Sequence, residues 1–276
     1  MNQVILITGT SSGIGLDAAV ELATRGATVV ATMRDLAKAD VLRDRALAAG
    51  VVLDIRALDV TDEDQAADCV ADVLADHGRI DTLINNAGRG AVGSAEQLNM
   101  DEIRDQLAVN YLGPVHLTKL VLPVMREAGS GRILTITSVG GAVGQPFADA
   151  YCGAKFAVEG FMQSLAPVAQ QLGVWVSVVE PAAVASDFVS NVQRPDPGTG
   201  AYAALLSAYL QRTAGAFANA QSSVDAAAAI ADAATSSTYR FRWQTSQAAT
   251  AFVGMSLKDL DGEGVLAATR TWIASG

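Results

Sequence analysis

The sequence predicts an α/β fold, in which a doubly wound, mostly parallel seven-stranded sheet carries helices on both faces and a helical lid. Short apolar, β-branched runs alternate with longer helical patterns along most of the 276 residues, and this alternation is typical of parallel sheets. The first run leads directly into a glycine-rich turn. Because half of the residues are apolar, one buried core is sufficient. We therefore predict a single domain over residues 1–276, with a lid insertion at about 190–238.

Composition narrows the class of protein. A formal net charge of −10 and a pI near 4.6 argue against a surface that attracts nucleic acid or anionic lipid. The first residues lack a basic segment and a cleavage site, and no apolar run reaches the roughly 18 residues that span a bilayer. Two cysteines, Cys69 and Cys152, indicate neither a disulfide framework nor a metal site. We expect a cytoplasmic protein that acts on small molecules.

The first predicted unit is a strand, a glycine turn and a helix. The strand covers Val4 to Thr8 and the helical pattern runs through Leu22. Between them lies the turn Gly9, Thr10, Ser11, Ser12, Gly13, Ile14 and Gly15, with the spacing G-x-x-x-G-x-G. Glycines allow close approach of a ligand, and a helix N-terminus offers N–H groups to a pyrophosphate. The turn is therefore a candidate dinucleotide site, although a tight strand-to-helix connection has the same appearance.

The second strand, Ala27 to Met33, bears on the choice of nucleotide. An acidic side chain at this strand end binds the ribose of NAD, whereas an arginine suits the 2′-phosphate of NADP. Met33 stands where the acid is expected and Arg34 follows it. We predict NADP, and the alternative is NAD with Asp35 as the selecting residue.

The next two strands also end in candidate ligand-binding residues. A helix over 36–49 precedes a third strand, Val51 to Val60, whose end places Asp59 and Val60 on the ligand side of the sheet. Asp59 is suited to an adenine amino group, or alternatively to capping the following helix. A fourth strand, Ile80 to Ile84, ends in Asn85 and then Asn86, Ala87 and Gly88, whose small side chains and amide leave room for a ribose.

A long helix is predicted over residues 99–128, with a kink at Pro114. Asn110 is unusual inside a helix because its amide competes for backbone hydrogen bonds. We expect it to bind a backbone carbonyl or a water near the active centre; local packing is the alternative. His77, next to Gly78 before the fourth strand, is expected to be exposed.

The central pair of the site is Tyr151 and Lys155, four residues apart on one predicted helix face. A nearby ammonium favours the phenolate and draws the tyrosine pKa toward neutrality, which makes a general acid usable at working pH. Ser138 follows the fifth strand, Gly131 to Thr137, and can reach the same point. Cys152 has no histidine or acid beside it and is interpreted as a small filler side chain.

The last part of the chain is predicted to hold the lid. A sixth strand, Trp175 to Val179, leads to Pro181, Val184 and Ser186 at its carboxyl end. Beyond residue 190 the strand rhythm stops, and helices are predicted at about 201–218 and 223–234. A seventh strand covers Tyr239 to Thr245, and the tail is helical. The apolar lid side chains are candidates for substrate contact, or for ordinary core or dimer contacts: Phe188, Tyr202, Leu205, Leu206, Tyr209 and Phe217.

Taken together, these motifs resemble the short-chain dehydrogenase/reductase family, whose fold is Rossmann-type. The resemblance covers the chain to about residue 190, and three stretches are most similar to the 17β-hydroxysteroid and retinol dehydrogenase branch. The matching positions are Thr8-Gly9-x-x-x-Gly13-Ile14-Gly15, Asn85-Asn86-Ala87-Gly88, Asn110, Ser138 and Tyr151-x-x-x-Lys155. Two positions depart from the family pattern, since Ala182 replaces a glycine and Ser186 replaces a threonine after the sixth strand.

The resemblance implies a role for each member of the tetrad. Tyr151 transfers a proton to or from the substrate oxygen, Ser138 binds that oxygen, Lys155 lowers the tyrosine pKa and holds the nicotinamide ribose, and Asn110 positions a relay water. The expected activity is NADP-dependent interconversion of an alcohol and a carbonyl on a small lipophilic substrate, without a metal. The alternatives are an NAD-preferring dehydrogenase and a non-catalytic dinucleotide-sensing or scaffold protein. Family habit suggests a homodimer or homotetramer.

Overall fold

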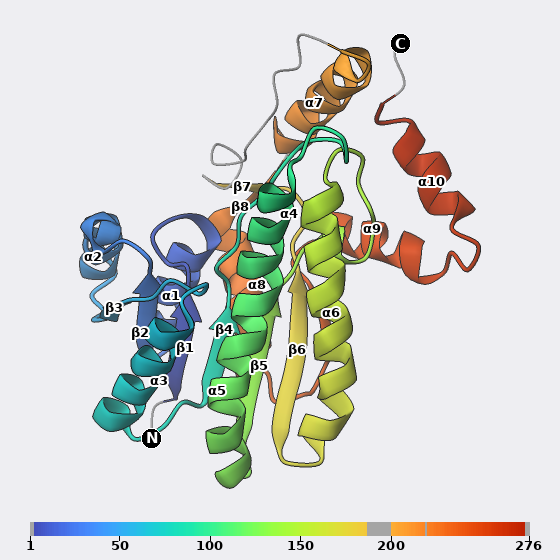
Figure 1. The fold of residues 1–276 in the computed structure, drawn as a ribbon. Coiled ribbons are helices and arrows are strands. Elements are labelled where there is room, and N and C mark those ends of the chain that lie inside the picture. The colour runs from blue at the N-terminus through green and yellow to red at the C-terminus, as the bar shows by residue number, and fades with distance from the viewer. Residues whose placement is uncertain (1–2, 187–199, 219, 274–276) are drawn as a thin grey trace.

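A computed structural model describes residues 3–186, 200–218 and 220–273 and shows one parallel seven-stranded sheet flanked by helices (Figure 1). The strand order is β3-β2-β1-β4-β5-β6-β9, and every described pair is parallel. The order reverses between β1 and β4, which is where ligands bind in open sheets of this kind. The predicted fold class is confirmed. The strands are β1 (Val4–Thr8), β2 (Thr28–Met33), β3 (Asp54–Ala57), β4 (Thr82–Asn85), β5 (Gly131–Ile136), β6 (Val174–Glu180) and β9 (Arg242–Gln244).

Two apolar layers hold the helices against the sheet. One layer packs Leu6, Leu83 and Ile133 of the strands against α3, α5 and α6, and Figure 1 shows these three helices over one face. The other layer packs Ile5, Ile7 and Leu134 against α1, α2 and α8. The helices are α1 (Gly13–Thr24), α2 (Ala39–Ala48), α3 (Glu63–His77), α4 (Met100–Leu107), α5 (Gly113–Glu127), α6 (Asp149–Gln170), α7 (Ala203–Ala218), α8 (Ser223–Thr235), α9 (Gln247–Leu257) and α10 (Glu263–Arg270).

The predicted helix over 99–128 is two helices joined by a π-helical turn, Ala108–Leu112. Asn110 lies in the middle of this turn, and Pro114 follows at the start of α5, where its missing N–H costs nothing. The irregularity in the predicted long helix is this π turn, which ends two residues before Pro114. Such π turns occur frequently at functional sites.

The predicted lid also needs correction at its C-terminal end. Helix α8 is part of the core, since Ala227, Ile230 and Ala231 are at most 1% exposed and pack with the α1 side of the sheet. Helix α7 instead packs away from the sheet, beyond the carboxyl ends of the strands (Figure 1). Two short strands that the sequence did not predict, β7 (Val184–Ala185) and β8 (Gln221–Ser222), pair in parallel at the base of this segment. The lid candidate is thus α7.

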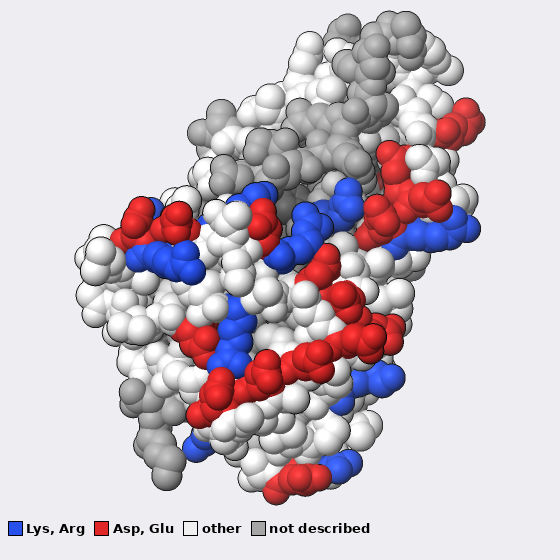
Figure 2. Space-filling view, turned by 60° about the vertical axis from the view of Figure 1, so that its left-hand side comes forward, with Lys and Arg blue, Asp and Glu red and all other residues white. Residues whose placement is uncertain are grey.

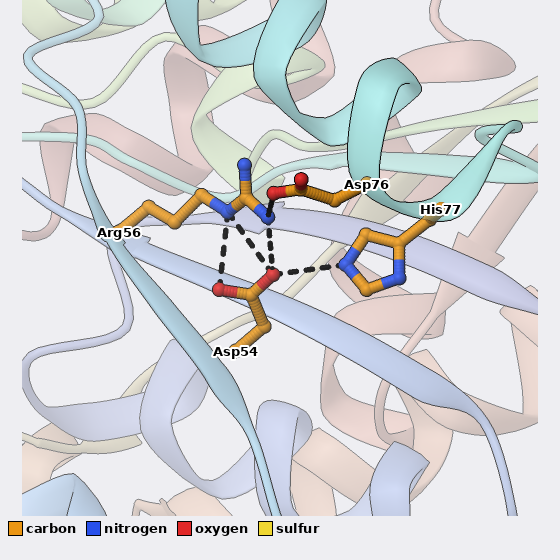
Figure 3. A network of polar contacts seen from close by, with 4 residues as sticks. All are labelled: Asp54, Arg56, Asp76 and His77. Carbon is orange, nitrogen blue, oxygen red and sulfur yellow. Dashed lines mark hydrogen bonds and ion pairs between the residues drawn. The ribbon is translucent and has the colours of Figure 1, made fainter.

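The third strand is shorter than predicted and is fixed to α3 by charged side chains. Before it, Val51 and Leu53 pack against the core without strand pairing, while Val52 is 91% exposed. Figure 3 shows that Asp54 of β3 accepts hydrogen bonds from Arg56 (Nη2 to Oδ2, 2.5 Å) and His77 (2.9 Å), while Arg56 also binds Asp76 at 2.7 Å. The expectation that His77 is exposed is wrong, because its ring contacts Asp54.

The acidic balance of the composition is visible on the surface. Helix α3 exposes Asp64, Asp68, Asp72 and Asp76 at four-residue intervals, and a row of acidic side chains crosses the face drawn in Figure 2. Like charges at this spacing repel one another and phosphate groups alike. Among the described residues, no helix combines the length and apolarity that crossing a membrane requires.

Candidate active site

The glycine turn after β1 is shaped for close backbone approach. Gly9 and Gly13 have φ values of +72° and +58°, which favour glycine. A Cβ at Gly15 would lie 2.2 Å from Asn86 Nδ2 and 2.3 Å from the Gly9 carbonyl oxygen. Within the described part of the chain, the Ser12 side chain leaves the first N–H groups of α1 without a cap. These N–H groups, together with that of Ser11 before them, are available to a pyrophosphate. The Thr10 N–H instead donates to the Thr32 carbonyl at 3.0 Å, which ties the turn to the end of β2.

Hydrogen bonds join the ends of β1 and β4 at the switch point of the sheet. The Thr8 hydroxyl accepts from the backbone N–H groups of Asn86 (3.0 Å) and Ala87 (2.9 Å). In return, Asn86 Nδ2 donates to the carbonyls of Thr8 (2.8 Å) and Gly9 (3.0 Å). The amide of Asn86 therefore ties adjacent strand ends together. Ile14 packs at the edge of the core beneath the turn.

The end of β2 presents one cation. Met33 is buried at 1% exposure and belongs to the core. Arg34 is exposed and forms no hydrogen bond or ion pair with any residue that the structure describes. Asp35 is engaged locally, since its Oδ1 accepts from the Ala37 N–H at 3.0 Å and caps a short 3₁₀ helix, Leu36–Lys38.

Asp59 and Val60 follow the end of β3, at the carboxyl ends of the strands. Asp59 Oδ1 accepts from the backbone N–H (3.0 Å) and the hydroxyl (2.7 Å) of Thr61. The alternative interpretation of Asp59 as the helix cap is wrong, because Asp62 caps α3 by accepting from the Gln65 N–H at 3.0 Å. Val60 is buried and packs against Gly113. A Cβ added at Gly113 would lie 2.9 Å from the Val60 carbonyl oxygen.

Three members of the predicted tetrad meet between β5 and α6. Lys155 Nζ lies 5.9 Å from the centre of the Tyr151 ring, so both side chains share one face of α6. Lys155 is 4% exposed and donates to the Ile136 carbonyl at 2.9 Å. Ser138 forms a hydrogen bond with Tyr151, and its Oγ also accepts from the Gly140 N–H at 3.0 Å.

Asn110 brings the π turn to the same place. It is fully buried, and its Nδ2 donates to the Arg89 carbonyl (2.9 Å) and to Gln106 Oε1 (3.1 Å). A Cβ at Gly88 would lie 3.0 Å from Asn110 Oδ1 and 3.6 Å from Lys155 Nζ. The predicted bond from Asn110 to a backbone carbonyl is confirmed, and Gly88 is the small residue that lets the asparagine and the lysine approach.

The pKa values differ from the sequence-based expectation. Burial raises the pKa of Tyr151 above its ordinary value, and the opposing effect of the Ser138 hydrogen bond is smaller. Burial also lowers the pKa of Lys155 to about 8, although the nearby Glu159 carboxylate raises it. The expected depression of the tyrosine pKa by Lys155 is wrong for this structure, because desolvation of the phenol dominates. Burial likewise raises the pKa of the Cys152 thiol to about 11, which fits a filler side chain.

The segment after β6 returns to the glycine turn. The Pro181 carbonyl accepts from the Val139 N–H at 2.9 Å, and Val184 is 5% exposed. A Cβ at Gly13 would lie 3.1 Å from Ser186 Cβ, so Ser186 faces the turn. Pro181, Val184 and Ser186 thus line the same region as the tetrad and the glycines.

The lid helix α7 and the residue before it pack against Phe147, two residues before the start of α6. Phe147 has a φ of +59° and packs against Tyr202 (ring centres 6.4 Å apart) and Tyr209 (5.7 Å). Leu206 and Tyr209 are buried at 1% and 5% exposure, so for them the packing interpretation is right. Trp272 of the tail stacks on Phe252 of α9 at 5.7 Å. Phe188 lies outside the described residues.

Comparison with known proteins identifies the family. A family model described as short chain dehydrogenase matches residues 3–197. The chain belongs to the short-chain dehydrogenase family. Among curated relatives, retinol dehydrogenase 8 from Bos taurus is 36% identical over 94% of this chain and 86% of its own length. The 17-beta-hydroxysteroid dehydrogenase type 1 from Homo sapiens is 42% identical over 68% of this chain and 59% of its own.

Solved structures of the family agree with the fold. A short-chain dehydrogenase from Streptomyces avermitilis superposes with a TM-score of 0.84 at 32% identity, covering 95% of this chain and 94% of that one. A metagenomic short-chain oxidoreductase in complex with NADP has a TM-score of 0.62 at 37% identity, covering 65% and 81%. The chain spans 60% of the length of human retinol dehydrogenase 8, which is 42% identical over 67% of this chain. The branch predicted from the motifs is confirmed.

Sequence reasoning missed one group of residues near the site. Glu159, Glu180 and Arg242 form ion pairs directly behind Lys155. Glu159 itself could have indicated this group in the sequence. It is a charged residue one helical turn after Lys155, and it lies on the face of α6 that carries the core residues Val158 and Met162.

Proposed function

We propose that this chain is an NADP-dependent oxidoreductase that interconverts a secondary alcohol and a ketone, or an alcohol and an aldehyde, on a small lipophilic substrate. The observation that carries the proposal is the convergence of Asn110, Ser138, Tyr151 and Lys155 on one point beside the glycine turn. A bound nicotinamide would supply or accept the hydride. The protein then needs to handle one proton and one developing oxyanion.

The residues around the glycine turn suit a dinucleotide. Gly9 to Gly15 provide a backbone surface without side chains in the way and a helix N-terminus with free N–H groups. Asp59 and Val60 would flank the adenine, and Asn86 to Gly88 would line the ribose. Lys155 would hold the nicotinamide ribose, with Pro181, Val184 and Ser186 along the opposite wall.

Tyr151 is the proposed proton donor to a substrate carbonyl. Ser138 already binds the tyrosine side chain, so it would contact the same substrate oxygen and stabilise its negative charge as hydride arrives. Because the raised pKa keeps the phenol protonated at neutral pH, it is ready to act as an acid in carbonyl reduction. Asn110, fixed to the Arg89 carbonyl, would hold a water that relays the proton from solvent.

The coenzyme preference rests on the end of β2. Arg34 is exposed without a partner in the described part of the chain, so it can bind a 2′-phosphate. One carboxylate oxygen of Asp35 already accepts a hydrogen bond from the Ala37 N–H. The metagenomic relative in complex with NADP is 37% identical to this chain. The names of the retinol and hydroxysteroid dehydrogenase relatives, together with the apolar residues of α7, favour a lipophilic substrate.

The experiment that tests the activity combines NADPH with a panel of hydrophobic ketones and aldehydes. Wild type is expected to oxidise NADPH with at least one of them, and Tyr151→Phe, which removes only the hydroxyl, is expected to lose at least about a hundredfold in kcat. Turnover that survives the substitution would refute the role of Tyr151. Cofactor binding without turnover on any carbonyl or alcohol would favour a dinucleotide-sensing protein.

The coenzyme preference needs its own test. Arg34→Ala is expected to weaken NADPH binding by about tenfold or more while NADH binding changes little, because a charged hydrogen bond contributes about 1.5–3 kcal/mol. Arg126→Ala is the matched control. Arg126 is also exposed, but it lies in the last turn of α5, which precedes β5 and so is far from the carboxyl ends of the strands. An unchanged NADPH affinity in Arg34→Ala would make NAD the better assignment.

A further inference from the structure

Buried charged side chains form a connected group directly behind Lys155. Glu159 of α6 and Glu180 of β6 are 2% and 0% exposed, and both bind Arg242 of β9. The distance from Arg242 Nη1 to Glu159 Oε2 is 2.5 Å. Glu180 also accepts from Gln244 through its second oxygen, so both of its oxygens are engaged, as in an ionised carboxylate.

Glu159 reaches from the helix of Lys155 to the turn of Ser138. It follows Lys155 by four residues and therefore lies on the same face of α6. A Cβ at Gly141 would be 2.3 Å from Glu159 Oε1, which shows how closely the carboxylate approaches the backbone of the turn that Ser138 begins. Among the described residues, Oε1 has no hydrogen-bond partner. A buried carboxylate oxygen in this state is costly unless a cation balances it.

A charge count identifies that cation. When both carboxyl groups are ionised, Glu159 and Glu180 carry two negative charges and Arg242 carries one positive charge. Burial and the nearby Glu159 raise the pKa of Glu180, which the bonds from Gln244 and Arg242 oppose. Lys155 is the nearby group that completes the balance when it is protonated, and Glu159 is the charged residue that acts on its amine. Tyr151 is the other titratable side chain of α6 close to the amine.

The other elements packed on α6 include α5, α4 and the π turn. The ionisable side chains of α5 are the half-buried His116 and the exposed Lys119, Arg126 and Glu127. The π turn and α4 contribute two amides, Asn110 and Gln106, which bind each other. The charged side chains of α4 are engaged elsewhere: Arg104 pairs with Asp101, Asp105 pairs with Arg89, and Glu102 accepts from the Asn99 N–H at 2.8 Å. The partner of Glu159 on β9 is Arg242, which β6 balances with Glu180.

We propose that Glu159 is a positioning residue that keeps the Lys155 amine protonated and holds the Ser138 turn against the helix of Tyr151. Its consequence for catalysis rests on the proposed function. Glu159 touches neither substrate nor cofactor and acts through its neighbours. Replacing its carboxylate by an amide of the same shape removes the charge and preserves the volume.

The direct test is titration of the Lys155 amine. The chain has four lysines, Lys38, Lys119, Lys155 and Lys258, so ¹³C labelling at lysine Cε gives few NMR signals, and a Lys155→Gln sample assigns the relevant one. The wild-type pKa is expected at about 8. In Glu159→Gln it is expected to fall by about one unit, because a nearby negative charge that favours the ammonium is lost.

Glu180→Gln is the matched control because it removes a buried carboxylate from the same arginine, one step farther from Lys155. Both variants are expected to lose stability, but Glu180→Gln is expected to shift the Lys155 titration less. An unchanged titration in Glu159→Gln, or an equal shift in Glu180→Gln, would overturn the proposal. If Glu159→Gln does not fold, Glu159→Asp is titrated in its place, because it keeps the charge but withdraws the carboxylate by one methylene. A smaller fall of the Lys155 pKa is expected there, and an unchanged titration would also overturn the proposal.

Catalysis supplies a second readout. With less positive charge beside it, Tyr151 is expected to need a higher pH to become the base for alcohol oxidation, so the pH profile of kcat/KM shifts upward in Glu159→Gln. An unshifted profile in a variant whose Lys155 titration has moved would overturn the link to Tyr151. Absence of turnover in wild type would contradict the proposed function, whereas the lysine titration tests Glu159 in either case.

Discussion

Gly15 is the position where a single methyl group should be most damaging to the cofactor turn. In Gly15→Ala the new Cβ would stand 2.2 Å from Asn86 Nδ2 and 2.3 Å from the Gly9 carbonyl oxygen, both far inside contact distance. Asn86 cannot simply rotate away, because its Nδ2 donates to the Thr8 and Gly9 carbonyls at 2.8 and 3.0 Å. The substitution therefore forces either the side-chain bonds or the glycine turn to give way.

The expected cost follows from three contributions. Losing the two hydrogen bonds of Asn86 removes about 2 kcal/mol, since each contributes about 1 kcal/mol. Overpacking a tight site costs about 1–3 kcal/mol. Alanine at a helical position returns about 1 kcal/mol relative to glycine, and Gly15 lies in the first turn of α1. The net loss in the free energy of unfolding is about 2–4 kcal/mol, with weaker NADPH binding because the displaced backbone is the proposed phosphate cradle.

Urea denaturation and NADPH titration measure both effects. Gly160→Ala is the matched control, because Gly160 lies within α6 and a Cβ there meets no described heavy atom within 4 Å. It should be stabilised by about 0.5–1 kcal/mol. In an Asn86→Ala background the cost of Gly15→Ala should shrink, since part of the clash is gone. Equal stability of Gly15→Ala and Gly160→Ala would refute the close approach.

Three further outcomes follow from the polar contacts. Thr8→Val leaves two backbone N–H groups at the end of β4 without an acceptor and should cost about 2–4 kcal/mol in denaturation; a loss under about 1 kcal/mol would contradict this. Burial acts to raise the pKa of Asp54, but hydrogen bonds from Arg56 and His77 outweigh it and lower this pKa overall. The ionised Asp54 carboxylate therefore stabilises the fold above about pH 4, and this contribution is lost as the pH falls through the pKa of Asp54 in the folded protein. Asp54→Asn should accordingly lose less stability than wild type between about pH 4 and pH 2, and parallel curves would argue against it. Since burial raises the Tyr151 pKa, initial rates of alcohol oxidation should climb between about pH 7 and pH 10, whereas a rate already maximal at pH 7 would contradict the raised value.

The regular part of the fold was predictable from local pattern. Buried parallel strands read as continuous apolar runs, so β1 was placed at its observed residues, Val4–Thr8. The third strand was predicted too long because Val51 and Val52 have strand composition, yet both precede the first residue that pairs with β2, Asp54. Val51 packs against the core without strand pairing, and Val52 is exposed. The two-residue strands β7 and β8 carry too little sequence to show any period.

The site was predictable as a set of residues and less so as electrostatics. The spacing of Tyr151 and Lys155 fixes a shared helix face, which the structure has. The balance between desolvation and charge depends on packing from distant segments, so the direction of the Tyr151 pKa could not be inferred from spacing. Arg242 joins the charge group from 83 residues beyond Glu159, a separation that no local pattern reports.

The pairing of β7 with β8 brings the two ends of the α7 segment together. Val184 pairs with Gln221 and Ala185 with Ser222, and the Gln221 side chain is anchored to Thr245 by reciprocal bonds of 2.8 and 2.7 Å. Since the entry and exit strands are fastened to each other, exchanging what lies between them adds little loop-closure entropy and leaves the sheet intact. This junction is therefore a natural splice point for transplanting the corresponding segment of a homologue, and so for changing which molecules the enzyme accepts without rebuilding its catalytic end.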